Sequence, residues 1–370
     1  MSTKPPVVML VNAVHKPFDT RIFQKEALSL VRAGYSVKII IPHTEDVDRD
    51  GVHISAVPLP RKGWEQLIRC PWLIFLKALK EPRRSIFHVH DSELLVIALW
   101  LRFLGRKVIY DAHEDTPLQI AYQHWIPGWF KKPYAWLYFL LEKKAGWFFN
   151  AIIVAEPVIA KYYPEKKTVL IRNFSKVETF KRLAEEKPYA ARSTKMAYVG
   201  LLSKPRGLFE MLEGASLAQQ VVPFTFLMGG KFAPLQLKEK VLSAYTIDYV
   251  GWVEYDKLPA ILCDAKIGII VPHPNPRYTT NYPVKLFEYM AAGLPVIASK
   301  EGEASAFVRE AGCGLLVDPL NTEDIAKAII WLFQHPAEAL AMGAKGQRLV
   351  FEKYNWEREE ERLLSLYNSF

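Results

Sequence analysis

The sequence predicts an α/β protein made of two doubly wound domains in series. Its 370 residues exceed the usual size of one domain, so two are expected. Half of the residues are hydrophobic and 24% are charged. This balance supports folded cores and excludes a disordered, collagen-like or coiled-coil chain. In both halves, short β-rich runs alternate with helical stretches, which is typical of parallel sheets covered on both faces.

The first domain is expected over residues 1–185. Its predicted strands are Val7–Val11, Val37–Ile41, Phe87–His90, Val108–Tyr110, Ala151–Ala155 and Val169–Arg172. Helices are expected over Arg21–Ala33 and Glu93–Leu104, since a glycine follows each apolar periodic stretch. Glu178–Ser193 is polar and shows no periodicity, which predicts a linker.

The second domain is expected over residues 186–355. Its predicted strands are Met196–Gly200, Phe224–Met228, Asp248–Val250, Ile267–Val271, Val296–Ala298 and Gly314–Val317. A final helix, Trp356–Tyr367 within residues 356–370, has apolar residues at helical spacing and is expected to pack back on the first domain. Ligands of such domains bind at the carboxyl ends of the strands and in the cleft between domains.

The cysteines and the N-terminus point to a cytoplasmic protein. Cys70, Cys263 and Cys313 are odd in number and far apart, which argues against a disulfide scaffold and a structural zinc site. The first residues lack the charged region followed by an apolar region and the small-residue cleavage site of a signal peptide. No apolar run approaches the roughly 20 residues that span a bilayer. We therefore expect a soluble protein, with peripheral attachment at the inner face of the plasma membrane as an option.

The positive charge lies entirely in the first half. Residues 1–195 contain 31 Lys and Arg against 19 Asp and Glu, whereas residues 196–370 contain 17 against 20. A basic half suits nucleic acid, an anionic membrane or a phosphate-bearing substrate. The sequence has no zinc-finger spacing, RRM signature or basic-region heptads, so nucleic acid is not expected.

The segment Trp125–Phe149 is unusually aromatic. Ten of its 25 residues are aromatic, four are Lys, and Glu142 is its one acidic residue. Aromatic rings beside lysines suit a water–lipid boundary and predict contact with an anionic membrane surface. A core helix whose lysines cover its outer face is the alternative.

The segment Asn281–Ser299 carries the clearest pattern for anion binding. Pro283 suits the first turn of a helix that begins at Val284 and stops at Gly293. A helix N-terminus offers free N–H groups and a positive dipole end, which suit a diphosphate. Lys285 adds a cation, and Glu288 could accept hydrogen bonds from a ribose diol. Taken alone, Glu288 is more often a solvated helix residue.

Tyr198–Leu208 supports the same interpretation. Gly200 follows a predicted strand, and Arg206 stands just before the next helix. An arginine fork can hold phosphate oxygens with two hydrogen bonds. Lys204 could assist. Arg-Gly near a helix start is nevertheless a weak motif by itself.

Three predicted strands of the first half end in histidine and acidic residues. They are followed by His15 with Asp19 and Arg21, by His90 with Asp91, and by His113 with Glu114. The carboxyl ends of parallel strands meet at one edge of a sheet, which favours a shared site. Singly, His15, His88 and His90 are each more often structural.

The run NYPVKLFEYMAAGLPVIAS resembles the signature of family 4 glycosyltransferases, retaining enzymes of the GT-B fold, in which two Rossmann-like domains face each other across a cleft. The resemblance implies that Glu288 binds the ribose of a sugar nucleotide. It places Arg206 where the family has a lysine that grips the diphosphate, and Val253 beside the nucleobase. Thr280 replaces the family's sugar-binding Glu, so Asn281 or the backbone of Tyr282 would contact the sugar.

The resemblance implies transfer of a sugar, with retention, from a nucleoside-diphosphate sugar to an acceptor. The basic first half and the aromatic segment Trp125–Phe149 suggest a glycan or lipid-linked acceptor, as in bacterial envelope or exopolysaccharide synthesis. Arg206, Lys285 and the helix start at Val284 would stabilise the leaving diphosphate, and His113 would orient the sugar. Neither a metal nor a cofactor is implied. The candidates for the acceptor side are His15, Asp19, Arg21, His90, Asp91 and Glu114. A sugar-nucleotide epimerase of the same architecture remains an alternative, as does a silent binding protein, given Thr280 and Leu201.

Overall fold

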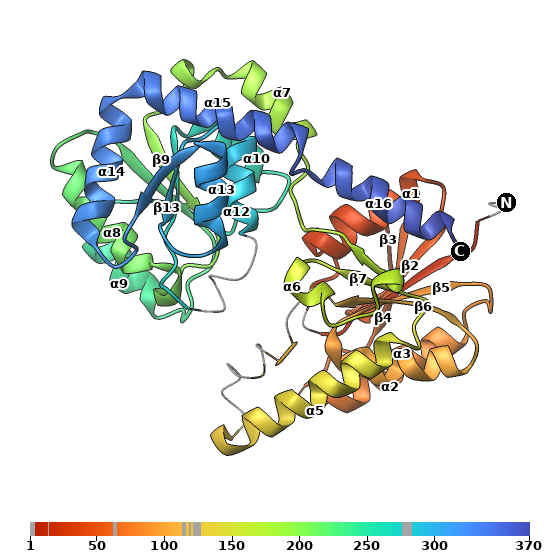
Figure 1. The fold of residues 1–370 in the computed structure, drawn as a ribbon. Coiled ribbons are helices and arrows are strands. Elements are labelled where there is room, and N and C mark those ends of the chain that lie inside the picture. The colour runs from red at the N-terminus through yellow and green to blue at the C-terminus, as the bar shows by residue number, and fades with distance from the viewer. Residues whose placement is uncertain are drawn as a thin grey trace. The chain divides into compact units, whose positions relative to one another are not determined.

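The computed structural model describes residues 4–13, 15–61, 65–112, 116–117, 120, 127–275 and 283–370. It divides into two compact units (Figure 1). Unit 1 comprises Met1–Asn173 and Glu359–Phe370, and unit 2 comprises Phe174–Arg358. Each unit is a Rossmann-like α/β layer structure built on a parallel sheet, as the alternation of strands and helices predicts.

Unit 1 has an eight-stranded sheet in the order β3-β4-β2-β1-β5-β6-β7-β8, parallel except for the antiparallel edge pair β3 and β4. The strands are β1 (Val7–Leu10), β2 (Val37–Pro42), β3 (Val47–Arg49), β4 (Val52–Val57), β5 (Ile86–His90), β6 (Lys107–Ala112), β7 (Ala151–Val154) and β8 (Thr168–Leu170). The helices are η1 (Thr20–Ala27), α1 (Leu28–Arg32), η2 (Glu65–Arg69), α2 (Cys70–Leu79), η3 (Ser92–Leu94), α3 (Leu95–Phe103), α5 (Gly128–Gly146), α6 (Pro157–Ala160) and η4 (Glu165–Lys167).

Helices cover both faces of this sheet. On one face, α2, α3 and the end of α5 pack on strand residues such as Val8 and Val89 (Figure 1). On the other face lies the C-terminal part of α16 (Trp356–Asn368), where the Tyr367 hydroxyl is 2.8 Å from His88 Nδ1. Residues 359–370 therefore belong to unit 1, although the chain reaches them through unit 2.

Unit 2 has a six-stranded parallel sheet in the order β11-β10-β9-β12-β13-β14. Its strands are β9 (Lys195–Val199), β10 (Thr225–Gly229), β11 (Asp248–Gly251), β12 (Ile267–Ile270), β13 (Val296–Ser299) and β14 (Gly314–Val317). Its helices are α7 (Glu178–Glu186), η5 (Tyr189–Ala191), η6 (Lys204–Arg206), α8 (Leu208–Gln219), α9 (Leu237–Ala244), α10 (Leu258–Asp264), α12 (Val284–Ala291), α13 (Glu303–Ala311), α14 (Thr322–Gln334) and α15 (Pro336–Glu352).

The predicted linker over Glu178–Ser193 is wrong. Its first half forms α7, which buries Phe180 in the core of unit 2 and packs on α10. One buried aromatic ring thus anchors a helix whose other residues are mostly polar. The division between the units consequently falls after Asn173, earlier than residue 185.

Within the described ranges, no helix combines the length and the apolar composition that crossing a bilayer requires.

Candidate functional site

In unit 2, the carboxyl end of β9 lies beside the start of α12. Gly200 follows β9, and the Lys285 side chain crosses directly over it. A Cβ at position 200 would lie 2.1 Å from Lys285 Cε, and the φ of Gly200 is +155°. Only glycine allows this approach. The structure therefore brings together two predicted donor-site residues that are far apart in the sequence.

The ammonium group of Lys285 is held in an unfavourable environment. Burial of this group and the positive charge of Arg206 lower its pKa from 10.5 to about 8, while Glu288 acts in the opposite direction. Glu288 lies one turn further along α12 and is 8% exposed. An anion bound here would relieve the repulsion between Lys285 and Arg206, so the pair is a candidate anion site.

The loop that carries Arg206 is fixed at two points. Gly207 ends η6 with φ +75°, and a Cβ there would lie 2.0 Å from the carbonyl oxygen of Val271. The His273 N–H donates to the carbonyl of Pro205 over 3.1 Å. His273 Nε2 also lies 3.0 Å from Glu210 Oε2 on α8. His273 and Glu210 are not among the site residues that the sequence predicts; the position of His273 just after the strand β12 is the signal that could have indicated it.

The first turn of α12 offers backbone donors. Pro283 is its N-cap, and in the described part of the chain no side chain caps this helix. The N–H of Leu286 bonds to the carbonyl of Pro283. The N–H groups of Val284 and Lys285 lie at the positive end of the helix dipole, next to the Lys285 ammonium.

Two other predicted donor-site residues, Val253 and Lys204, lie in unit 2 outside α12. Val253 follows β11 and packs over Gly229 at the end of β10. Lys204 is exposed at the start of η6. Thr280, Asn281 and Tyr282 lie outside the described residues.

In unit 1, His15 bridges two carboxylates at the carboxyl ends of β1 and β5. His15 Nε2 is 2.9 Å from Asp91 Oδ1, and its Nδ1 is 3.4 Å from Asp19 Oδ2. Asp19 also accepts hydrogen bonds from the first N–H groups of η1, and Asp91 accepts one from the N–H of Asn12. Asp91 has a φ of +76°, a strained value for a residue with a side chain.

The two carboxylates keep His15 protonated. Burial alone would lower its pKa, but hydrogen bonds and charges from Asp19 and Asp91 outweigh burial and raise the pKa to about 10. Burial of Asp19 is likewise outweighed by His15, so the pKa of Asp19 falls well below its usual range. The group is a partly exposed, net-negative set of hydrogen-bonding atoms that can receive hydroxyl groups.

We expect His15→Gln to remove a pH-dependent part of the stability. The folded-state pKa exceeds the ordinary value of 6.5, so the contribution is complete below pH 6.5 and is lost as the pH rises through about 10. Urea denaturation of the wild type and the variant checks this. The difference in unfolding free energy should shrink steadily between these two pH values; a difference independent of pH would contradict it.

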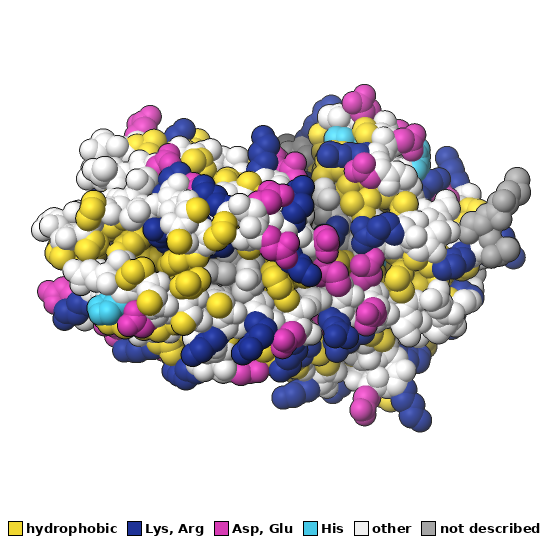
Figure 2. Space-filling model, turned by 90° about the horizontal axis from the view of Figure 1, so that it is seen from above, with side chains coloured by type: hydrophobic (Ala, Val, Ile, Leu, Met, Phe, Trp, Pro, Cys, Tyr) yellow, Lys and Arg dark blue, Asp and Glu magenta, His cyan; other side chains and the backbone are white. Residues whose placement is uncertain are grey.

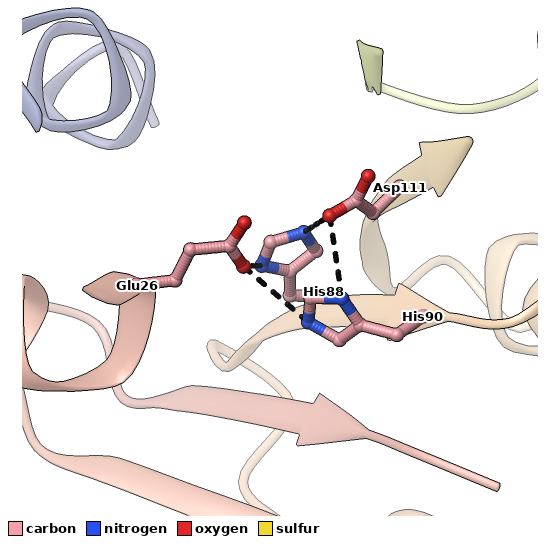
Figure 3. Close-up of side chains that lie close together, drawn as sticks. All are labelled: Glu26, His88, His90 and Asp111. Carbon is pink, nitrogen blue, oxygen red and sulfur yellow. Dashed lines mark ion pairs between the residues drawn. The ribbon is translucent and has the colours of Figure 1, made fainter. Parts of the chain in front are cut away.

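Arg21 and His90 are more deeply buried than His15 and Asp19, and they belong to a buried cluster of ionisable side chains. The cluster contains Glu26 from η1, His88 and His90 from β5, and Asp111 from β6 (Figure 3). Arg21 holds it together: its Nη2 is 3.1 Å from Asp111 Oδ2, and its Nε is 3.1 Å from Glu26 Oε1. Full burial of His90 and pairing of Arg21 favour a structural role over direct contact with a substrate. Glu26 is not among the residues that the sequence predicts for a site, whereas Asp111 lies in a strand end that the sequence marks by its His and Asp residues.

This cluster is also the one group among the described residues whose ligand atoms are close enough for a metal ion, all lying within 4.8 Å of one another. The two nitrogens of each imidazole, however, approach opposite carboxylates: His90 Nδ1 lies 3.3 Å from Asp111, and its Nε2 lies 3.7 Å from Glu26. Arg21 already supplies a positive charge. Arg21 offsets one of the two carboxylate charges, so a divalent cation would leave excess positive charge in a buried site. We therefore interpret the cluster as an ion-pair network.

His113 and Glu114 lie outside the described residues, as does Trp125.

Two family models match the chain. The one described as "Glycosyl transferase 4-like domain" matches residues 20–173, and the one described as "Glycosyl transferases group 1" matches residues 193–335. The first range includes strands β2 to β8 of unit 1, and the second includes strands β9 to β14 of unit 2. Among curated proteins, the D-inositol 3-phosphate glycosyltransferase of Rhodococcus opacus is 37% identical over 92 residues, which are 25% of this chain and 20% of that protein. The match therefore spans about a fifth of that relative's length.

Solved structures with the same fold cover nearly the entire chain. Sucrose-phosphate synthase from Thermosynechococcus elongatus superposes with a TM-score of 0.74 at 19% identity, over 99% of each chain. Anabaena Alr3699/HepE in complex with UDP superposes with a TM-score of 0.68 at 13% identity, over 99% of this chain and 100% of that one. Together with the two family models, this shows that the chain belongs to the family 4 glycosyltransferases of the GT-B fold.

Proposed function

We propose that the protein is a retaining glycosyltransferase that moves a sugar from a nucleoside-diphosphate sugar to a glycan or lipid-linked acceptor. The observation that carries this proposal is the position of the Lys285 ammonium. Lys285 lies in the first turn of α12, its side chain crosses over Gly200, and its positive charge is destabilised by Arg206. Two cations held together and partly desolvated are suited to a diphosphate. The solved complex of Anabaena Alr3699/HepE with UDP supports a uridine or related nucleotide as the ligand of this fold.

The chemistry follows from the charges that develop. As the bond between the anomeric carbon and the diphosphate breaks, negative charge grows on the leaving group. Lys285, Arg206 and the N–H groups at the start of α12 are fixed in advance where they would stabilise that charge. Glu288 lies on the same helix and would accept hydrogen bonds from the ribose. Retention fits attack from the face of the departing diphosphate, which can accept the acceptor's proton; no protein base or metal is required by this scheme.

On the acceptor side, we propose the group formed by His15, Asp19 and Asp91. It lies at the carboxyl edge of the sheet of unit 1, and its carboxylates can orient a sugar hydroxyl. An acceptor for bacterial envelope or exopolysaccharide synthesis is consistent with such a site.

A thermal-shift screen of sugar nucleotides tests the donor proposal. A ligand present at 100 times its dissociation constant stabilises the folded state by about 2.7 kcal/mol. The stabilising donor is then incubated with and without candidate acceptors. Transfer with retained configuration supports the proposal. Release of an altered sugar nucleotide without acceptor would show an epimerase, and binding without any turnover would show a silent binding protein.

The affinity for a nucleoside diphosphate should depend on pH through Lys285. Because its pKa is about 8, the cation is lost above that pH, and each further pH unit should weaken binding by up to about tenfold. Lys285→Arg keeps its charge, so its affinity should stay nearly constant over the same range. Calorimetry with UDP and GDP provides the measurement. Equal pH profiles for the two proteins would remove Lys285 from the site.

We also propose that α5 docks on an anionic membrane. In this described helix, none of the residues from Gly128 to Leu141 is buried, and Trp129 and Trp136 are 81% and 64% exposed. Only Glu142, Ala145 and Gly146 are buried, so a core role fits the last turns alone. Flotation with anionic and neutral liposomes tests the docking. Absence of the protein from both floated fractions would refute it.

A further inference from the structure

An apolar groove runs along α3 and reaches Phe148, in the segment that follows α5. It has a volume of about 620 Å³, within the range of roughly 300–1,000 Å³ typical of sites for small organic molecules. The residues that line it are Val96, Leu99, Trp100, Arg102, Phe103 and Phe148. Arg102 fixes its shape, since its Nε donates a hydrogen bond of 2.8 Å to the carbonyl of Phe148.

The far end of the groove is separated from the candidate acceptor site. α3 begins just after the carboxyl end of β5, where Asp91 pairs with His15. It ends at Phe103, near the start of β6, and Phe148 precedes the start of β7. The groove follows α3 from Val96 to Phe103, so its far end lies at the opposite edge of the sheet of unit 1, about 14 Å along the nine residues of α3.

The surface around the groove is apolar. The exposed large hydrophobic residues of α2, α3 and α5 and of the segments that directly follow α3 and α5 are Trp72, Leu76, Val96, Trp100, Phe103, Leu104, Trp129, Phe130, Trp136, Leu137, Leu141, Trp147 and Phe148. These three helices neighbour one another on one face of the sheet (Figure 1). Exposed apolar surface on this scale marks an interaction site.

The charge of the same helices selects the kind of partner. α2, α3 and α5 contain a single carboxylate, Glu142, which is buried and accepts a hydrogen bond from the Tyr110 hydroxyl. Lys132, Lys143 and Lys144 are exposed on α5. On the face shown in Figure 2, by contrast, Asp and Glu side chains lie among Lys and Arg. Aromatic rings with lysines and without exposed carboxylates complement the boundary of an anionic bilayer.

We propose that the groove receives one acyl chain of a bilayer phospholipid, with Trp100 and Phe103 inserted beside it and Arg102 next to the headgroup phosphate. This inference rests on the membrane docking proposed above and adds a second anchor. Trp129 and Trp136 lie in the first part of α5, whereas Phe103 and Phe148 lie at the other edge of the sheet, near the starts of β6 and β7. Two anchors would hold the whole α2–α3–α5 face on the bilayer and fix the orientation of unit 1 relative to a lipid-linked acceptor.

Photo-crosslinking tests the occupant directly. The full-length protein is bound to vesicles of phosphatidylcholine and phosphatidylglycerol that contain a phosphatidylcholine with a diazirine on its acyl chain. After irradiation, labelled peptides are identified by mass spectrometry. Label on residues 96–103 and on Phe148, in addition to α5, is expected. Label confined to residues 129–141 on vesicle-bound protein would overturn the proposal while leaving the docking of α5 intact.

A matched pair of double variants tests the contribution to binding. Trp100→Ser with Phe103→Ser should weaken vesicle binding by about tenfold or more. Leu320→Ser with Leu340→Ser removes comparably exposed apolar side chains from unit 2 and should leave it unchanged. UDP affinity should be the same in both, which separates this result from the transferase proposal. Unchanged vesicle binding in the first variant would overturn the inference. The inference would also be overturned if the wild type formed a dimer that this variant dissociates, and if no lipid label were found in the groove.

Discussion

Lys285→Ala is expected to lower kcat/KM for sugar transfer by about 10²–10³-fold. Such losses are typical when one preorganised group that stabilises developing negative charge is removed. The Lys285 ammonium lies over Gly200 and beside Arg206, so its loss leaves Arg206 and the helix start to bear the diphosphate alone. Initial rates with the donor identified by the screen provide the measurement.

Lys327→Ala is the matched control, because Lys327 is exposed on α14. It should retain wild-type rates. Arg206→Ala should resemble Lys285→Ala, and the melting temperatures of both site variants should stay close to that of the wild type. Wild-type rates for both site variants would place the diphosphate elsewhere.

Arg21→Met is expected to destabilise unit 1 by about 3–5 kcal/mol, the usual cost of breaking a buried ion pair by removing one partner. The Arg21 side chain is 5% exposed and its guanidinium contacts both Asp111 and Glu26. Without it, two buried carboxylates face each other across two imidazoles with too little positive charge. Denaturant unfolding followed by fluorescence measures the loss.

Arg32→Met provides the comparison. Arg32 forms an ion pair of 2.7 Å with Glu360, but its side chain is 53% exposed, so the change should cost at most about 1 kcal/mol. Adding Asp111→Asn to Arg21→Met should recover part of the stability, because it removes one uncompensated charge. Equal, small losses for Arg21→Met and Arg32→Met would contradict the assignment of the cluster as an ion-pair network.

The sheets could be predicted because their strands are continuous apolar runs. The predicted strand Gly314–Val317 matches β14, and the predicted helix from Val284 matches α12 to within one residue at its end. Parallel strands buried on both faces leave little ambiguity in such runs. The convergence of Gly200, Arg206 and Lys285 could be predicted as well, since each follows or opens an element at the carboxyl edge of one sheet.

The buried cluster could not be predicted in the same way. Glu26 lies within an apolar periodic stretch that predicts an ordinary amphipathic helix, whereas the structure has a π-helix over Thr20–Ala27. Its contact with His90 depends on the register of η1 against β5, which no local pattern specifies. The positive φ of Asp91 could not be predicted from the sequence either, because residues other than glycine rarely adopt such values.

A crystal structure of the full-length protein with a bound nucleoside diphosphate tests the central claim most directly. We predict phosphate oxygens within hydrogen-bonding distance of the Lys285 ammonium and the Arg206 guanidinium, with the ribose facing Glu288. A nucleotide bound away from the first turn of α12, with Lys285 still folded over Gly200 and no phosphate beside it, would contradict the account.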